Sequence, residues 1–339
     1  MKMVRVEDAI GLVLAHDLTK IVPGKYKGAA FKKGYIVKEE DIQELKDMGK
    51  NHLYIIELKE DEIHEDDAAL RIGQAIMGDS LYMEGPSEGK ISLKSSQRGL
   101  LKVDVEGLSA INEIEFIIVA TMHDNSLVEA GQTVAGTRII PLKIEKDKID
   151  KVEEICKLAG NIINIKPIMD LKIGIVVTGT EVFCGRITDK FGPILEEKVH
   201  KYGGRLMGVK KSPDEVSFIT DAIDAFIKEG ADVVLTSGGM SVDADDVTPT
   251  AITAVADEVI SYGSPVLPGA MFMIAYKGNV AILGVPACGM YHRTTILDLI
   301  LPRVLAGEKI TKRDIVSLGH GGLCLNCTVC SYPVCPFGK

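Results

Sequence analysis

Short apolar runs that alternate with helical segments dominate the second half of the chain. Runs with strand character lie at residues 172–177, 206–209, 232–236 and 280–283, and segments with helical spacing separate them. Near-continuous apolar runs are typical of strands buried in a parallel sheet. The alternation predicts an α/β fold, a three-layer sandwich with a mostly parallel sheet, with a smaller N-terminal α+β region before it. Ligands of such sheets bind at the carboxyl ends of the strands.

Two glycine-containing loops follow predicted strands at that edge. Thr178-Gly179-Thr180-Glu181 follows the first strand, and Thr236-Ser237-Gly238-Gly239 follows the third. Gly238 and Gly239 lack a Cβ atom, so an anion can approach bare backbone N–H groups near the start of the next helix. Asp245 and Asp246 stand beside this turn, where a divalent cation would let carboxylates face an anion. The alternative is a tight turn followed by acids that cap a helix.

Composition excludes two classes of partner. The formal net charge of −9 and the isoelectric point of 5.4 leave no basic surface of the kind that binds nucleic acid. Acidic residues occupy positions 7 and 8, where a signal peptide has its apolar core. The longest uncharged run, residues 259–276, is interrupted by proline and glycine, which argues against a membrane helix. We therefore expect a cytoplasmic protein that binds neither nucleic acid nor membrane.

Changes of pattern divide the chain into four predicted parts. These parts are an N-terminal segment (residues 1–60), an α+β unit of unknown role (61–168), an α/β domain (169–310) and a cysteine-rich tail (311–339). In the first part, apolar spacing predicts a helix over residues 6–18. In the second, glycine and proline at residues 85–89 predict a loop.

Four of the seven cysteines crowd into the tail. Cys324, Cys327, Cys330 and Cys335 have the spacing Cys-x2-Cys-x2-Cys-x4-Cys, followed by proline. In a reducing compartment, thiols at this spacing suit a metal rather than disulfides. The spacing is similar to that of bacterial ferredoxins, in which the fourth cysteine can serve another cluster, so a site shared by Cys335 and the other three is left open. We expect an iron–sulfur cluster, with structural zinc and a disordered thiol tail as the alternatives.

The α/β part resembles a known family. Residues 171–308 resemble the molybdopterin-binding domain shared by molybdopterin molybdotransferase, molybdopterin adenylyltransferase and a competence-damage-inducible protein family. The resemblance rests on Thr178-Gly179-Thr180-Glu181 with Asp189, Pro213-Asp214-Glu215, Ser237-Gly238-Gly239-Met240-Ser241-Val242, Asp246-Val247-Thr248-Pro249, Pro268-Gly269 and Leu301-Pro302 to Gly307. Residues 1–58 weakly resemble segments of the molybdotransferase.

The resemblance also implies site residues and ligands. Carboxylates of Glu181, Asp214 and Asp246 would hold Mg²⁺ or position the reacting phosphate and molybdate, with helix capping as the alternative for the two aspartates. The implied cofactor-binding set is Thr178, Gly179, Thr180, Asp189, Thr236, Ser237, Gly238, Gly239, Ser241 and Asp245. The implied ligands are molybdopterin or its adenylylated form, with molybdate and ATP. Implied protein partners are a molybdoenzyme, another protein of the cofactor pathway, or a second copy of the chain.

One loop departs from the family pattern. Val285-Pro286-Ala287-Cys288-Gly289 stands where the family has Leu-Pro-Gly-Asn-Pro or Leu-Pro-Gly-Gln-Pro. The retained acids favour a Mg²⁺-dependent enzyme of molybdenum-cofactor biosynthesis that inserts molybdate or transfers an adenylyl group. The altered loop favours a non-catalytic carrier or sensor of the cofactor that uses the cysteine cluster. A nucleotide hydrolase like the competence-damage family is the third possibility.

Overall fold

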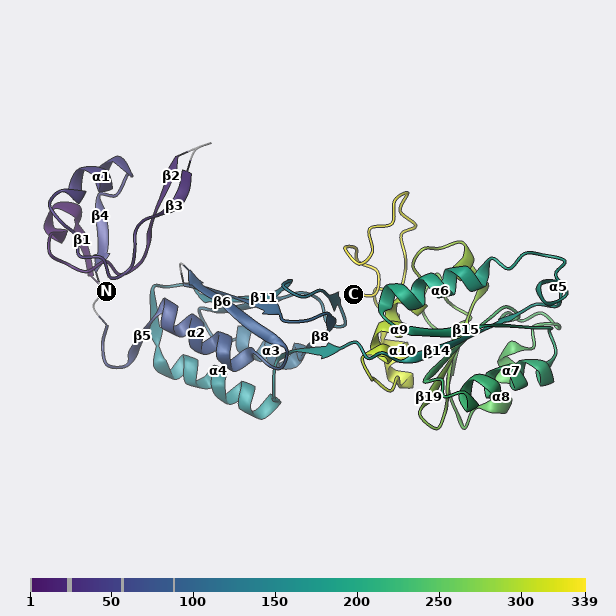
Figure 1. The fold of residues 1–339 in the computed structure, drawn as a ribbon. Coiled ribbons are helices and arrows are strands. Elements are labelled where there is room, and N and C mark those ends of the chain that lie inside the picture. Colours follow the sequence, from purple (N-terminus) through teal and green to yellow (C-terminus); the bar gives the residue numbers. More distant parts are fainter. Residues whose placement is uncertain (1, 23–25, 56–57, 88) are drawn as a thin grey trace. The chain divides into compact units, whose positions relative to one another are not determined.

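Contacts between residues divide the chain into two compact units. The computed structural model describes residues 2–22, 26–55, 58–87 and 89–339, and Figure 1 labels its elements. Unit 1 contains residues 1–97, 101–124 and 128–165, and unit 2 contains residues 98–100, 125–127 and 166–339. The finer division into four parts stays a prediction.

Short strands around a small core form the start of unit 1. The elements are β1 (Lys2–Arg5), the 3-10 helix η1 (Val6–Ala9), β2 (Leu18–Val22), β3 (Tyr26–Phe31), α1 (Asp41–Asp47) and β4 (His52–Ile55). β1 pairs with β4 and β2 with β3, both antiparallel. The helix predicted over residues 6–18 is wrong beyond Ala9. Gly11 has a φ of +78°, which a right-handed helix does not allow, and Val13 pairs with Ile36 in an extended bridge.

An α+β arrangement follows between residues 58 and 167. The elements are β5 (Glu62–His64), α2 (Glu65–Ile76), β6 (Leu81–Ser87), β7 (Lys90–Ser95), β8 (Gly99–Val103), α3 (Val105–Asn112), β9 (Ile117–Thr121), β10 (Leu127–Val128), β11 (Thr133–Ile139), β12 (Lys143–Glu145), α4 (Lys146–Ala159) and β13 (Ile163–Pro167). Four strands form a sheet in the order β6-β7-β11-β9. Strand β6 runs through Gly85 and Pro86, where a loop was predicted. Since β6 is an edge strand, the missing N–H of Pro86 is tolerated there.

Unit 2 contains the α/β fold. Its elements are β14 (Lys172–Thr178), α5 (Thr180–Phe183), α6 (Phe191–Tyr202), β15 (Arg205–Ser212), α7 (Val216–Lys228), β16 (Val233–Ser237), α8 (Thr248–Val255), β17 (Glu258–Tyr262), β18 (Met273–Lys277), β19 (Val280–Val285), the 3-10 helix η2 (Ala287–Met290), α9 (Ile296–Leu305) and α10 (Lys312–Ser317). The six-stranded sheet has the order β15-β14-β16-β19-β18-β17. Its first four strands are parallel, and β18 and β17 are added antiparallel. The predicted α/β fold with a mostly parallel sheet is confirmed.

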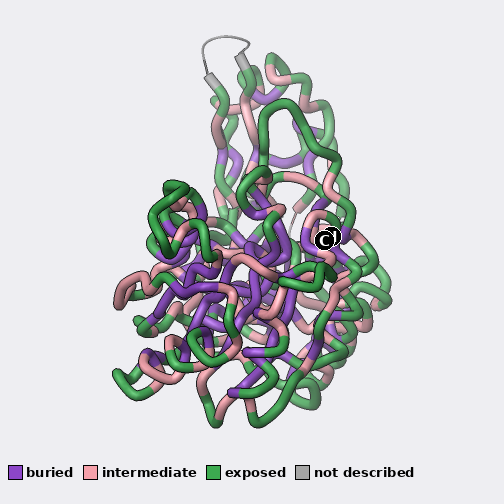
Figure 2. The backbone as a smooth tube through the Cα atoms, turned by 90° about the vertical axis from the view of Figure 1, so that its right-hand side faces the viewer, coloured by how far each residue is buried: buried purple, intermediate pink, exposed green. Residues whose placement is uncertain are grey.

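Helices cover both faces of this sheet. Neighbouring residues of a strand point to opposite faces. Ile175 packs with Leu195 of α6 and Ile300 of α9, whereas Val176 packs with Ile223 of α7. Figure 2 shows buried stretches inside the molecule and exposed stretches along its loops. The core cluster around Ile175 and the core cluster around Val176 lie on opposite faces of the sheet, so helices, sheet and helices form three layers. None of the helices in the described part of the chain has the length and apolar composition that crossing a bilayer requires.

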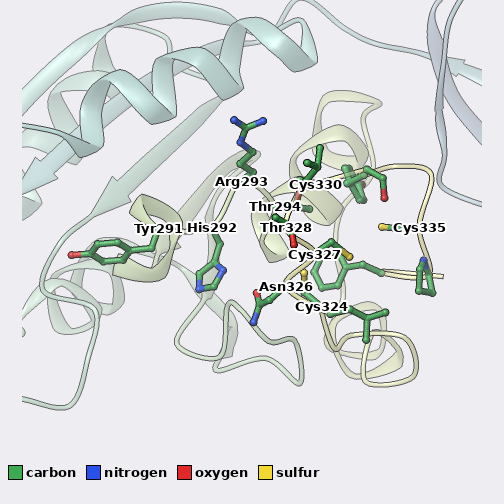
Figure 3. Close-up of a pocket in the computed structure, with 16 residues that line it drawn as sticks. Tyr291, His292, Arg293, Thr294, Cys324, Asn326, Cys327, Thr328, Cys330 and Cys335 are labelled. Carbon is green, nitrogen blue, oxygen red and sulfur yellow. Dashed lines mark hydrogen bonds between the residues drawn. The ribbon is translucent and has the colours of Figure 1, made fainter.

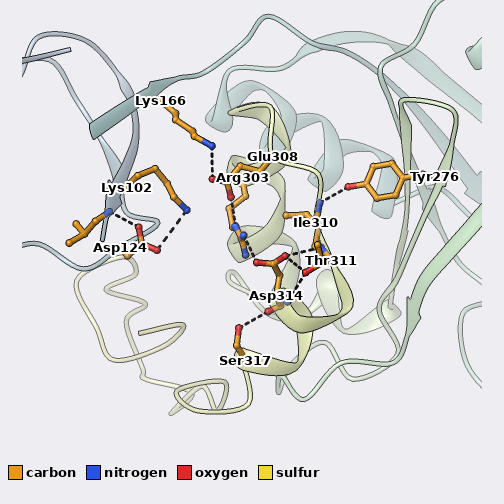
Figure 4. Close-up of polar contacts among 11 residues, drawn as sticks. Lys102, Asp124, Lys166, Tyr276, Arg303, Glu308, Ile310, Thr311, Asp314 and Ser317 are labelled. Carbon is orange, nitrogen blue, oxygen red and sulfur yellow. Dashed lines mark hydrogen bonds and ion pairs between the residues drawn. The ribbon is translucent and has the colours of Figure 1, made fainter. Parts of the chain in front are cut away.

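The segment after α9 is attached to the domain by ion pairs and core contacts (Figure 4). Arg303 of α9 donates to Asp314 of α10 at 2.6 Å, and the backbone N–H of Ile310 donates to the Tyr276 hydroxyl at 2.9 Å. Phe337, close to the C-terminal end, is 3% exposed and belongs to the same core cluster as α6 and α9. The cysteine-rich segment is therefore packed on the domain at both ends.

Acid is expected to loosen this attachment. Burial alone would raise the pKa of Asp314, but hydrogen bonds from Thr311 and Arg303 outweigh burial and lower the pKa to about 2. A depressed pKa contributes stability that is complete above the unfolded-state value of ~3.9, and this stability disappears as pH falls through the folded-state value. We expect Asp314→Asn to lower the free energy of unfolding by about 1–2 kcal/mol near neutral pH.

Urea unfolding of both proteins at a series of pH values measures this effect. The difference between them should shrink as the pH falls from about 4 towards 2, because Asp314 is then protonated first in the unfolded chain and finally in the folded protein. A difference that stays constant down to the lowest pH at which the protein folds would contradict the assignment.

Candidate functional site

The carboxyl ends of three neighbouring strands meet at one edge of the sheet in unit 2. β14 ends at Thr178, β16 at Ser237 and β19 at Val285. The strand register pairs Val177 with Ser237, and Ser237 with Val285. The two glycine loops and the loop after β19 therefore begin side by side.

The glycine turn after β16 lies against the first loop. Gly238 has a φ of +92° and Gly239 a φ of +52°, conformations that favour glycine. A Cβ atom on Gly238 would stand 2.6 Å from the hydroxyl oxygen of Thr178 and closer still to its carbonyl oxygen. The Thr178 hydroxyl donates to the Ser237 carbonyl at 3.1 Å and lies 3.1 Å from the Thr248 hydroxyl. Thr178 thus joins the turn to the start of α8.

Asp246 shapes the segment between the glycine turn and α8. Its Oδ2 accepts the backbone N–H of Ser241 at 2.9 Å, and Oδ1 has no partner within the described residues. The Tyr262 hydroxyl, from β17, donates to the Met240 carbonyl at 2.9 Å. Burial raises the pKa of Tyr262 and the charge of Asp246 adds to the shift, so the phenol lies near that carboxylate. Tyr262 was not among the site residues predicted from the sequence. The predicted residue Asp245 is exposed.

The other predicted acids hold separate positions. Oδ2 of Asp214 accepts the backbone N–H of Thr180 at 2.8 Å and its hydroxyl at 3.1 Å. Asp214 therefore fixes the first loop, and its carboxylate does not cap helix α7. Oδ1 of Asp189 accepts the first two backbone N–H groups of α6, both at 2.9 Å, which is a helix cap. Glu181 is exposed on the single turn of α5.

Two hydroxyls at the end of β16, those of Thr236 and Ser237, differ in their hydrogen bonding. The Thr236 hydroxyl donates to the Leu283 carbonyl at 3.3 Å, so it is used inside the sheet. Ser237 is fully buried, and its Oγ has no hydrogen-bond partner among the described residues. A buried polar atom without a partner costs roughly 1–3 kcal/mol, so Ser237 is the hydroxyl here that would gain most from a ligand or a water molecule.

The acids of this edge do not converge on a point. Within the described ranges, no group of three or more His, Cys, Asp or Glu side chains is arranged to hold one metal ion. Mg²⁺ commonly keeps several waters and uses one or two carboxylates together with substrate phosphates. A preformed cage is therefore not required, and the magnesium site at Glu181, Asp214 and Asp246 stays a prediction.

The four tail cysteines line a second site, a cavity of about 450 Å³ in unit 2. Cys324 and Cys335 are half-buried, whereas Cys327 and Cys330 are exposed, and none is in a disulfide. Residues 291–294, which precede α9, line the same cavity (Figure 3). The other cysteines of unit 2, Cys184 and Cys288, do not line it.

A buried charge network fixes the segment before α9. Lys198 of α6 donates to both oxygens of Asp298, at 2.7 and 2.8 Å, and to the Arg293 carbonyl at 2.9 Å. Tyr202 donates to Asp298 at 2.7 Å, and Asp298 is fully buried. This network was not predictable from the sequence, because its members are far apart in the chain. Thr295 and Asp298 form a capping box, and their three-residue spacing was the one local signal of it.

Comparison with known families agrees with this architecture. Residues 174–306 match a family model described as a probable molybdopterin binding domain. The α/β part of the chain therefore belongs to the molybdopterin-binding domain family. Residues 3–57 match a second family model, described as a domain of unknown function, DUF8806.

Individual relatives cover parts of the chain only. A CinA-like protein of Mycobacterium sp. strain MCS is 38% identical over 80 residues, which is 24% of this chain and 19% of that protein. The chain thus spans about a fifth of the length of the curated relatives that it matches. A crystal structure of the molybdopterin biosynthesis enzyme MoaB from Thermus thermophilus is 21% identical, covering 41% of this chain and 98% of that chain with a TM-score of 0.37. The tungsten cofactor synthesizing protein MoaB from Pyrococcus furiosus is 22% identical, covering 40% and 96%, with a TM-score of 0.34.

Proposed function

We propose that unit 2 binds molybdopterin and acts in the biosynthesis or maturation of the molybdenum cofactor. The observation that carries the proposal is the family match of residues 174–306. The site is the strand edge at which Thr178, Ser237 and Gly238 meet. In the glycine turn, where Gly238 and Gly239 have positive φ angles, backbone N–H groups would bind the pterin phosphate.

The finer proposal is a Mg²⁺-dependent reaction, either molybdate insertion or adenylyl transfer. Asp214 and Asp246 each use Oδ2 to fix a loop, and Oδ1 of each has no protein partner in the described part of the chain. Each carboxylate can therefore offer one oxygen to a cation. The ion would neutralise charge on a phosphate or molybdate, which these carboxylates cannot face directly. Glu181, which follows Thr180 on α5, would be the third acid.

A carrier or sensor of the cofactor is the second candidate. The observation that favours it is the loop after β19, residues 286–290, which continues into residues 291–294 of the cysteine-lined cavity. In this version the pterin binds at the same edge but no reaction follows. A nucleotide hydrolase stays the third possibility, without support from a particular contact.

Further predictions from the sequence belong to the same proposal. They are a cytoplasmic location, molybdate and ATP as further ligands, a molybdoenzyme or cofactor-pathway protein as partner, and homo-oligomer assembly. The tail cysteines stay a predicted site for an iron–sulfur cluster or zinc, separate from the pterin site.

Asp246→Asn tests the magnesium role. Asparagine keeps an acceptor for the Ser241 N–H, so the free energy of unfolding should change by no more than ~0.5–1 kcal/mol. Mg²⁺-dependent binding of ATP, adenylylated pterin or molybdate should weaken at least about tenfold, or ~1.4 kcal/mol. Calorimetric titration with magnesium and with a chelator measures the difference.

Asp221→Asn is the matched control. It removes the same charge from the exposed surface of α7 and should leave binding unchanged. If the unmodified protein binds pterin equally well with and without magnesium, the proposal of a cofactor carrier or sensor replaces the proposal of a Mg²⁺-dependent enzyme. If the folded, unmodified protein binds no molybdopterin at all, the proposed function is wrong.

A further inference from the structure

The four tail cysteines line one cavity without gathering around a single metal-ion position. All four line the cavity of about 450 Å³, so Cys335 lies at the same site as the other three. Yet no three Cys, His, Asp or Glu side chains within the described residues are placed to hold a single ion. The four cysteines are therefore neighbours around one cavity.

The walls of this cavity are fixed by the domain. On one side, the backbone N–H of Cys324 donates to the Leu267 carbonyl at 2.8 Å, and Leu267 donates to Gly322 at 2.8 Å. On the other side, the Tyr332 hydroxyl donates to the Asp298 carbonyl at 3.2 Å, and Phe337 is buried in the core. The segment between these anchors carries the two exposed thiols. Hydrogen bonds and core packing therefore anchor the cysteine-containing segment to the domain on both sides of the exposed thiols.

The arrangement discriminates between a mononuclear and a multinuclear centre. Zinc bound by four thiolates needs Zn–S distances near ~2.3 Å in a tetrahedron, which brings the sulfur atoms to within about 3.8 Å of one another. In an iron–sulfur cluster with four irons each thiolate binds a different iron, so the sulfur atoms stand around the inorganic core. Four cysteines that line one cavity, without a single-ion arrangement among the described residues, favour the second geometry.

The surroundings also suit an anionic centre. Arg293 lines the cavity, and Lys201 lies with its ammonium 5.9 Å from the ring of Tyr332, another lining residue. The Thr294 hydroxyl is 3.4 Å from Sγ of Cys330, a contact of the kind that stabilises cluster sulfur. Positive charge and a hydroxyl beside the thiols both favour a cluster that carries net negative charge.

We propose that Cys324, Cys327, Cys330 and Cys335 together ligate one 4Fe–4S cluster in this cavity. The proposal goes beyond the pterin site, since the ligands all lie outside residues 174–306. It concerns binding, and the two sites can be tested separately on the full chain.

Metal and sulfide analysis of the full chain, purified without oxygen, tests the proposal. We expect about four iron atoms and about four acid-labile sulfides per chain, with the broad visible absorption of a cluster that reduction bleaches. Cys327→Ser and Cys335→Ser should each lower the iron content at least about fivefold, since each removes a ligand. Cys184→Ser, which changes an exposed cysteine outside the cavity, should leave iron and sulfide unchanged.

Three results would overturn the cluster. One is a single zinc per chain without sulfide. Another is four titratable thiols with neither metal, after incubation with ferrous iron and sulfide under reducing conditions. The third is full iron in Cys335→Ser, which would remove that residue from the site. Circular dichroism of each variant shows whether the domain is folded, and pterin titration of the same samples reports on the other site independently.

Discussion

Gly238→Ala is expected to lower the free energy of unfolding by about 2–4 kcal/mol and to abolish pterin binding. The added Cβ would stand 2.6 Å from the Thr178 hydroxyl oxygen and in contact with its carbonyl, in a backbone with a φ of +92°. Either the turn moves away from Thr178 or the threonine leaves Ser237 and Thr248, to which it is hydrogen bonded. Both movements displace the backbone N–H groups that the proposed phosphate needs.

Gly278→Ala separates the two causes of this loss. Gly278 also has a positive φ, +55°, but a Cβ atom there meets nothing within 4 Å. Its substitution should cost only the conformational part, about 1–2 kcal/mol, and leave pterin affinity unchanged. Urea unfolding and titration with molybdopterin measure both quantities. Equal costs for the two variants would show that the turn does not approach Thr178 closely. Unchanged affinity of a folded Gly238→Ala would remove the turn from the binding site.

Asp298→Asn should be the most damaging single change of charge in unit 2. The substitution leaves Lys198 buried, with 8% of its side chain exposed, and without a counter-charge. Removal of one partner of a buried ion pair costs about 3–5 kcal/mol. The Tyr202 hydroxyl loses a charged acceptor as well, although the amide oxygen can still accept from one donor. We expect a large fall in the urea midpoint, measured by circular dichroism.

Two further variants make this interpretation specific. Glu258→Gln breaks the exposed pair with Lys309, whose partners are 3.2 Å apart, and should cost no more than ~1 kcal/mol. Adding Lys198→Met to Asp298→Asn removes the stranded charge, so part of the lost stability should return. A double variant that is no more stable than the single one would mean that the cost comes from packing and not from the unpaired ammonium.

The parallel strands were predictable because their signal is local. Residues 172–177, 232–236 and 280–283 are near-continuous apolar runs, and they correspond to β14, β16 and β19. The two antiparallel strands, β18 and the edge strand β17, were not predicted. Proline and glycine lie between them and a register shift occurs between Val259 and Ser261, so neither the run nor its alternation is regular. The helix predicted over residues 6–18 failed for a similar reason, since apolar spacing does not reveal the positive φ of Gly11.

The candidate sites also contain features that the sequence predicts and features that it does not. The order of strands and loops placed Thr178, Ser237 and Gly238 at one sheet edge, because the carboxyl ends of parallel strands are neighbours. The roles of individual side chains depend on distant partners and were not predictable. Asp214 is held by Thr180, and Asp298 meets Lys198 one hundred positions away. Cysteine spacing indicated a metal site, but the cavity itself needs residues 291–294, which no spacing connects with the tail.

The segment from Pro286 to Thr294 connects the two proposed binding sites. It starts where β19 ends beside Ser237 and finishes as a wall of the cysteine cavity, so one stretch of nine residues borders both proposed ligands. If occupancy of the cavity shifts this stretch, the affinity for pterin changes by some factor. Linkage then requires the pterin to change the affinity for the cluster by the same factor. Any effect of the proposed cluster on pterin affinity would therefore be matched by an equal effect of pterin on cluster affinity.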